Sequence, residues 1–147
     1  REEHLGIVEI PIDQIVGTKT AGRQNAFAAN FMPFVEPGSE FALKWSNLYE
    51  YQTTEGNRDP IFAYEFLNRF YVQEGNKRVS VYKYLNSPSI EGKLIRLVPR
   101  KSDSKENRIY YEFMEFYKAT KINYLIFKFI YTCRKHSGIK SHYSPSL

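Results

Sequence analysis

The chain has 147 residues, of which 42% are hydrophobic and 16% are aromatic, so it is not a disordered protein, and we expect a single globular core. Its one cysteine, Cys133, excludes an internal disulfide and a cysteine-based metal cluster. The net charge of +5 arises at the end of the chain, because five basic residues and no acidic residue follow from Lys121 onward. The preceding chain is neutral, and its composition gives no support for non-specific DNA binding.

The sequence shows no apolar run long enough to span a membrane and no signal peptide ahead of the first predicted strand. We therefore expect a cytoplasmic protein without a membrane partner. The chain begins with Arg1 rather than Met, which is also compatible with a fragment of a longer protein.

The first predicted element is a strand over Gly6–Pro11, which Pro11 ends because proline cannot donate to a strand ladder. A single helical turn over Ile12–Ile15 follows. The polar loop Gly17–Arg23 then carries two glycines, two hydroxyls and the cations Lys19 and Arg23. These two cations are candidates for contacting a bound phosphate, although such a loop is more often only a solvated connection.

A helix is predicted from the N-cap Ser39 to about Tyr51. Apolar and aromatic residues recur along this helix at the i, i+4, i+7, i+8 spacing that places them on one face. We expect that face to dock on a sheet. The residues of the face are Phe41, Trp45, Leu48, Tyr49 and Gln52.

Two antiparallel strands, Ile61–Phe66 and Phe70–Gln73, are predicted next, the first of them well inside the sheet because both of its faces are largely apolar. This hairpin leads to Glu74 and Gly75, and a helix over 76–86 begins directly after them. Its predicted core residues are Val79, Tyr82 and Leu85.

The remaining pattern predicts a strand over Lys93–Val98, a helix over 103–118 and a last strand over Asn123–Tyr131. Asp103 and Glu106 are a candidate capping pair for that helix. Its predicted buried residues are Ile109, Phe113, Phe116 and Tyr117. We therefore expect an α+β fold with a small mixed or antiparallel sheet and helices packed on it, forming one domain over 1–132, followed by a basic, mobile tail over 133–147.

The turn from Gln73 into the helix after Gly75 is the candidate functional site. The first N–H groups of a helix lack intrahelical partners, and the helix dipole makes their surroundings positive, so this position suits a phosphate or carboxylate. Gly75 allows a ligand to approach the backbone, and Lys77 and Arg78 add full positive charge. Glu74 is the carboxylate placed to act as a catalytic base or to hold a metal such as Mg²⁺.

The run Glu74-Gly75-Asn76-Lys77-Arg78 resembles the acidic-Gly-x-x-Arg box of the ParB/sulfiredoxin superfamily. The resemblance implies a ParB/sulfiredoxin-like fold and a site at which Gly75, Asn76, Lys77 and Arg78 grip the phosphates of a nucleotide. Two departures limit what it implies about chemistry. Asn76 stands where sulfiredoxins carry their catalytic cysteine, which excludes sulfinic-acid reduction. Lys77 stands where the serine kinases of the superfamily carry histidine, which weakens a kinase assignment.

Two classes of function follow. In the first, the chain is a ParB-like domain that binds a nucleotide or another phosphate ligand, with Mg²⁺ as a candidate cofactor. Such a domain could act in phosphoryl transfer or in nucleotide or phosphodiester hydrolysis, as a nuclease does. In the second, it is a non-catalytic DNA- or protein-binding module with a vestigial phosphate site. The sequence alone does not decide whether the chain is an enzyme, nor does it reveal the oligomeric state.

Overall fold

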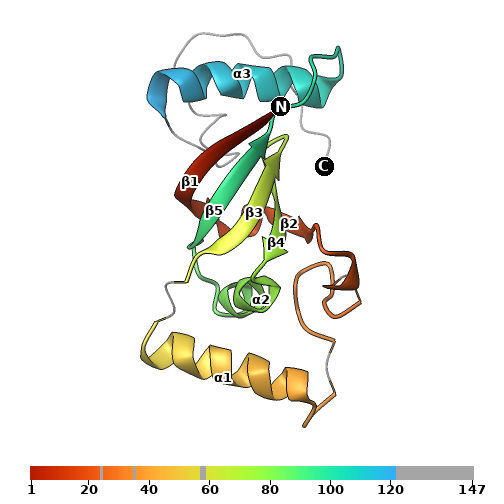
Figure 1. The fold of residues 1–147 in the computed structure, drawn as a ribbon, viewed down its shortest axis with the longest axis vertical. Coiled ribbons are helices and arrows are strands. Elements are labelled where there is room, and N and C mark those ends of the chain that lie inside the picture. The colour runs from red at the N-terminus through yellow and green to blue at the C-terminus, as the bar shows by residue number, and fades with distance from the viewer. Residues whose placement is uncertain (24, 35, 57–58, 122–147) are drawn as a thin grey trace. The chain divides into compact units, whose positions relative to one another are not determined.

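The computed structural model describes residues 1–121 except residues 24, 35, 57 and 58. The chain divides into two compact units, Arg1–Tyr111 and Glu112–Leu147. The first unit contains the whole described sheet and the candidate site (Figure 1). The predicted strand over Asn123–Tyr131 and the predicted tail over 133–147 lie outside the described residues.

The sheet has five strands in the order β1-β5-β3-β4-β2 (Figure 1). It is mixed, because the β1–β5 and β3–β4 pairs are antiparallel whereas the β3–β5 and β2–β4 pairs are parallel. This arrangement confirms the α+β class and the central position of the strand at Ile61–Phe66. The strand bounds are β1 Glu2–Pro11, β2 Ile15–Thr18, β3 Ile61–Phe66, β4 Arg69–Glu74 and β5 Ser89–Leu97.

The helices confirm the three predicted segments with small shifts of their ends. They are α1 Glu40–Thr54, α2 Asn76–Tyr84 and α3 Lys105–Thr120, together with the short 3-10 turns Ile12–Gln14 and Ala21–Arg23. Ser39 caps α1 as predicted, because its side chain accepts a hydrogen bond from the Ala42 N–H at 3.1 Å. None of the helices in the described part of the chain is long and apolar enough to cross a membrane.

One strand was not predicted. Gly17 and Thr18, expected in a polar loop, belong to β2, which pairs in parallel with β4. A parallel partner more than fifty residues away leaves no local signal in a short segment that contains glycine. The hairpin between β3 and β4, in contrast, is closed by a two-residue turn in which Leu67 and Asn68 have φ angles of 52° and 62°.

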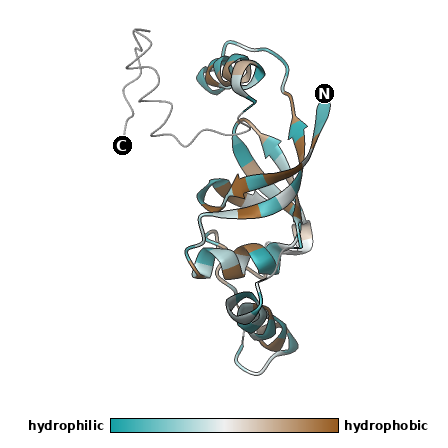
Figure 2. Ribbon diagram, turned by 90° about the vertical axis from the view of Figure 1, so that its left-hand side faces the viewer, coloured by the Kyte–Doolittle hydropathy of each residue, from teal (hydrophilic) through white to brown (hydrophobic). Residues whose placement is uncertain are grey.

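The core lies between one face of the sheet and α2. Ile61 and Ala63 of β3 are fully buried, and so are Val79 and Val81 of α2. Two charged residues of the sheet are also buried, Glu65 on β3 and Arg96 on β5. The strands are rich in hydrophobic residues, whereas hydrophobic and hydrophilic residues alternate along α1 (Figure 2).

The predicted docking of α1 on the sheet is wrong, because α1 packs on α2 instead. The indole N–H of Trp45 donates to the buried Ser80 Oγ at 2.9 Å, and the rings of Trp45 and Tyr49 both contact Tyr84 edge-on. None of the residues of α1 is buried. The physical reason is that α2 already covers this face of the sheet, so α1 forms an outer layer on α2 (Figure 1).

The predicted cap of α3 is also wrong. The helix begins at Lys105, and Ser104 rather than Asp103 caps it by accepting from the Asn107 N–H at 3.3 Å. The buried side chains of α3 are Asn107, Tyr110, Phe113 and Met114, whereas Phe116 and Tyr117 are only half-buried.

Candidate functional site

The turn between β4 and α2 is built around Gly75, which has φ 100° and ψ 23°. A Cβ atom at this position would lie 2.6 Å from Cγ2 of Ile61 on the neighbouring strand β3. Glycine is therefore required by both the left-handed backbone and the packing of the turn on β3. The first helical bond then runs from the Val79 N–H to the Gly75 carbonyl oxygen at 3.0 Å.

Asn76, the first residue of α2, is only 6% exposed, and its Oδ1 atom has no hydrogen-bond partner in the described structure. Asn76 also lines a cavity of about 290 Å³. The other walls come from β2, from the segment between β2 and α1, and from β4, and they include Val16, Thr18, Phe27, Phe31 and Tyr71. The cavity is thus walled mainly by apolar and aromatic side chains and has polar groups at the start of α2.

The loop after β2 is fastened along the end of β4. The Lys19 N–H and the Thr18 hydroxyl donate to the Val72 carbonyl oxygen at 2.8 and 3.1 Å, and the Thr20 hydroxyl donates to the Gln73 carbonyl oxygen at 2.7 Å. The two threonines therefore lie beside the turn at Gly75.

The two loop cations are not both brought to that turn. The Lys19 ammonium lies 3.6 Å from the centre of the Tyr64 ring on β3, a cation–π contact. The backbone of Arg23 forms part of the turn Ala21–Arg23, and its side chain lies outside the described structure.

The two cations in the first turn of α2 both contact other parts of the protein. Nη1 of Arg78 donates to the carbonyl oxygens of Asp59 and Pro60 at 2.6 and 2.9 Å, so Arg78 fastens the segment that leads into β3. The ammonium of Lys77 lies 4.6 Å from the centre of the Phe41 ring on α1. Glu65, the buried acid of β3, is bonded to Arg96 instead.

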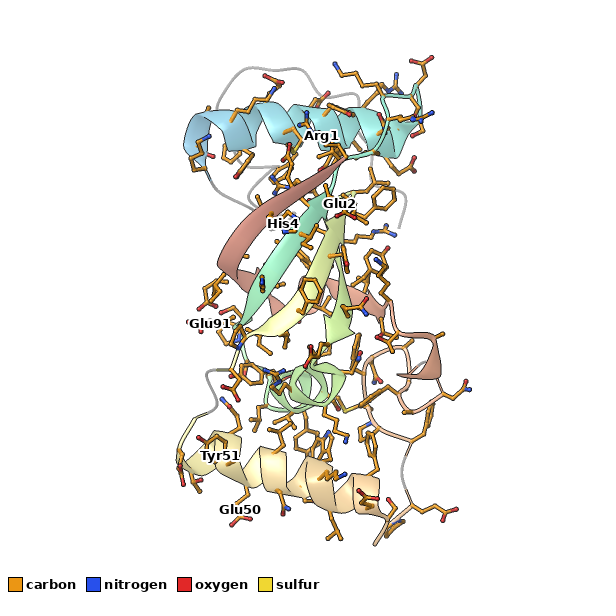
Figure 3. The ribbon with its side chains drawn as sticks, in the orientation of Figure 1. Arg1, Glu2, His4, Glu50, Tyr51 and Glu91 are labelled. Atoms are coloured by element: carbon orange, nitrogen blue, oxygen red, sulfur yellow. The ribbon has the colours of Figure 1, made fainter. Side chains whose placement is uncertain are left out.

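Glu74 is exposed at the end of β4 and pairs with Phe62 in the strand register. Within the described ranges, no group of three or more His, Cys, Asp or Glu side chains could hold a metal ion. A Mg²⁺ ion at Glu74 would therefore take most of its ligands from water and from the phosphates of a bound molecule. His4 lies on β1, toward the end of the sheet remote from α2, and takes no part in this site (Figure 3).

Sequence reasoning did not find the cavity or the burial of Asn76. The available signal was the pair of aromatic residues Phe27 and Phe31 in a segment otherwise rich in small and turn-forming residues. Both rings are buried, and their centres are 6.3 Å apart. An aromatic pair inside an irregular segment indicates that the segment folds back on the core rather than running through solvent.

Comparison with known proteins identifies similar folds. No protein-family model matches the chain, and no curated protein matches it. The crystal structure of sulfiredoxin from Arabidopsis thaliana is 22% identical, with a TM-score of 0.43, and the match covers 71% of this chain and 96% of that chain. A Pnob8-like ParB-N domain is 11% identical, with a TM-score of 0.44, and the match covers 84% of this chain and 53% of that one. The likeness to both structures concerns the fold alone.

Proposed function

We propose that the chain binds a phosphate-bearing ligand, such as a nucleotide, where β4 turns into α2. The observation that carries this proposal is the direct turn from β4 into α2 at Gly75, which leaves the first N–H groups of the helix beside Arg78. Helix starts of this kind bind anions through backbone N–H groups and the positive end of the helix dipole. The hydroxyls of Thr18 and Thr20 and the guanidinium of Arg78 supply further polar groups beside the same turn.

Arg78 can donate hydrogen bonds to the phosphate only if it gives up its present hydrogen bonds. At present it donates to two neutral carbonyl oxygens. A phosphate is a stronger acceptor for a guanidinium group, because the hydrogen bonds are then assisted by charge on both sides. Ligand binding would therefore draw Arg78 from Asp59 and Pro60 toward the start of α2. Glu74, which is exposed nearby, is the candidate for activating an attacking group if the bound ligand also reacts.

The second candidate function is a non-catalytic module for DNA or protein binding. The positions of Lys77 and Arg78 favour it, because both cations already contact groups of the protein itself. A chain that has lost its ligand would retain such structural contacts and lose the affinity for phosphate.

Thermal denaturation in the presence of nucleoside triphosphates and tripolyphosphate, with and without Mg²⁺, separates these candidates. A ligand that binds only the folded state raises the melting temperature by mass action. A rise that depends on Arg78 supports the phosphate site. If none of these compounds shifts the melting temperature at millimolar concentration, the phosphate site is refuted and the non-catalytic module is favoured.

A further inference from the structure

We infer that the cavity next to Asn76 receives the nucleobase of a nucleotide, and that the Asn76 side chain accepts a hydrogen bond from an N–H group on the edge of that base. This inference rests on the proposed phosphate site and assigns the other part of the ligand. It also makes Asn76 a specificity residue rather than a phosphate-binding one.

The side-chain amide of Asn76 indicates which kind of group the ligand presents to it. Its Oδ1 is buried and has no hydrogen-bond partner in the described structure. A buried acceptor without a donor lowers the stability of a protein, so such groups are rare and point to a missing partner. The missing partner must be an N–H or O–H donor, because an amide oxygen only accepts.

The charge of the cavity indicates which part of the ligand enters it. None of the side chains in the described part of the chain that line it is charged. A phosphate group placed inside would lose its hydration without meeting a cation, which is strongly unfavourable. The phosphates therefore belong outside the cavity, at the start of α2 near Arg78, and an uncharged part of the ligand belongs inside.

The walls of the cavity indicate the shape of the part of the ligand that enters it. The rings of Phe27, Phe31 and Tyr71 line the cavity, and the first two are buried. Gly17 leaves room for the Tyr71 ring, because a Cβ atom there would lie 3.2 Å from Cδ1 of that ring. Aromatic walls favour a flat ring, since bases stack on aromatic side chains. The volume of about 290 Å³ is that of a small ligand pocket and suffices for one base.

One wall of the cavity has an uncommon backbone conformation. Phe31 has φ 64°, which is uncommon for a residue with a bulky side chain. Two hydrogen bonds hold this turn, from the Phe31 N–H to the Ala28 carbonyl oxygen and from the Ala28 N–H to the Met32 carbonyl oxygen, both at 2.8 Å. The wall is therefore kept in an unfavourable backbone conformation that places the ring of Phe31 at the cavity. A flat, uncharged ring with N–H groups on its edge satisfies all four observations, and a nucleobase is such a ring.

The test measures the contribution of the base by isothermal titration calorimetry. The four nucleoside triphosphates are compared with tripolyphosphate, which lacks the base and sugar, and with ribose 5-phosphate, which carries the sugar alone. For the wild-type protein we expect at least one nucleotide to bind about tenfold more tightly than tripolyphosphate, the scale of one additional hydrogen bond. Asn76→Ala should reduce this preference to within about twofold and leave the affinity for tripolyphosphate unchanged.

Two further variants keep the test decisive. Tyr71→Leu should also reduce the preference for the nucleotide, and Asn47→Ala, an exposed asparagine on α1, should leave it unchanged. Asn76→Ala should not lower the melting temperature of the free protein, because it removes an unpaired buried acceptor.

Each other outcome refutes the inference. If wild-type protein binds tripolyphosphate and nucleotides equally, the phosphate site stands and the base assignment falls. If Asn76→Ala loses both ligands together, Asn76 belongs to the phosphate site instead. If ribose 5-phosphate matches the best nucleotide, the cavity recognises the sugar. If none of the compounds binds the wild-type protein, the proposed function falls as well.

Discussion

Nε of Arg96 lies 2.6 Å from Oε2 of Glu65, and both side chains are fully excluded from solvent between the parallel strands β3 and β5. The carboxylate of Glu65 also accepts from the Asn68 N–H at 2.8 Å, and the Tyr110 hydroxyl lies 3.5 Å from the same Oε2 atom. The pair therefore joins the β3–β4 turn, β5 and the start of α3. Burial raises the pKa of Glu65, because loss of hydration outweighs the attraction of Arg96.

We predict that Arg96→Met lowers the free energy of unfolding by about 3–5 kcal/mol at pH 8, because it leaves the Glu65 carboxylate buried without its cation. The loss should be smaller at pH 5.5. Without Arg96 the pKa of Glu65 in the folded state is raised further. At a pH above the pKa that Glu65 has in the unfolded state, the folded state therefore binds more protons than the unfolded state. Stability then increases as the pH falls. Urea denaturation between pH 5.5 and 8 measures this dependence.

Arg100→Met is the matched control for that prediction, because Arg100 is exposed on the same segment of chain. It should change stability by less than about 0.5 kcal/mol at every pH. An Arg96→Met variant whose loss of stability is equal at pH 5.5 and pH 8 would show that Glu65 is not the titrating group.

We predict that Arg78→Ala has two separable effects. The loss of the hydrogen bonds to Asp59 and Pro60 should lower stability by only about 1 kcal/mol, because these bonds are exposed. The affinity for tripolyphosphate should fall by about 1.5–3 kcal/mol, the scale of hydrogen bonds to a charged group. Melting temperature and affinity are measured on the same sample, with the exposed Arg108→Ala as control. A stability loss with unchanged affinity would remove Arg78 from the ligand site.

We predict that Gly75→Ala lowers the free energy of unfolding by about 2–4 kcal/mol, through the left-handed backbone and the close contact with Ile61. Gly22→Ala is the comparison, because a Cβ atom at Gly22 meets no atom within 4 Å. That variant should be nearly neutral. Chemical denaturation of both variants checks the contrast, and equal effects would mean that the turn at Gly75 adjusts to a side chain.

We predict that Trp45 and Ser80 are energetically coupled by about 0.5–1.5 kcal/mol, the net value of one hydrogen bond. The variants Trp45→Phe, Ser80→Ala and their combination form a double-mutant cycle that measures the coupling. Hydrogen exchange should also become faster in α1 than in α2 in the single variants, since α1 has no buried residue to hold it. Strictly additive losses would indicate that this hydrogen bond does not hold α1, and that ring contacts such as those with Tyr84 and Lys77 do.

Elements with strong local signals could be predicted from the sequence. Ser39 supplies a cap for α1, Pro11 ends β1, and the apolar run Ile61–Phe66 gives β3 with the observed bounds. In each case the cause lies within a few residues of the element. The turn at Gly75 belongs to the same group, because a glycine between a strand and a helix marks such a turn by itself.

The features that the sequence does not reveal depend on partners far along the chain. β2 forms because Gly17 lies beside Tyr71, and the cavity forms because Phe27 and Phe31 fold toward Asn76. Glu65 occurs in an otherwise apolar strand, and its burial makes sense only once Arg96 is known to lie opposite. The docking of α1 was mispredicted for a similar reason, since an apolar helix face does not identify the surface that covers it.

The strand order also has a consequence for how the chain folds during synthesis. β3 and β4 meet through a two-residue turn and can pair as soon as both are made. In the described part of the chain β1 pairs with β5 alone, about eighty to ninety-five residues later, so its pairing is slow and comes late. Until Leu97 has left the ribosome, β1 lacks its partner in the described sheet and β3 lacks its neighbour on one side. Nascent chains are therefore most exposed to pairing with one another at these two strands, before the last strand of the sheet is complete.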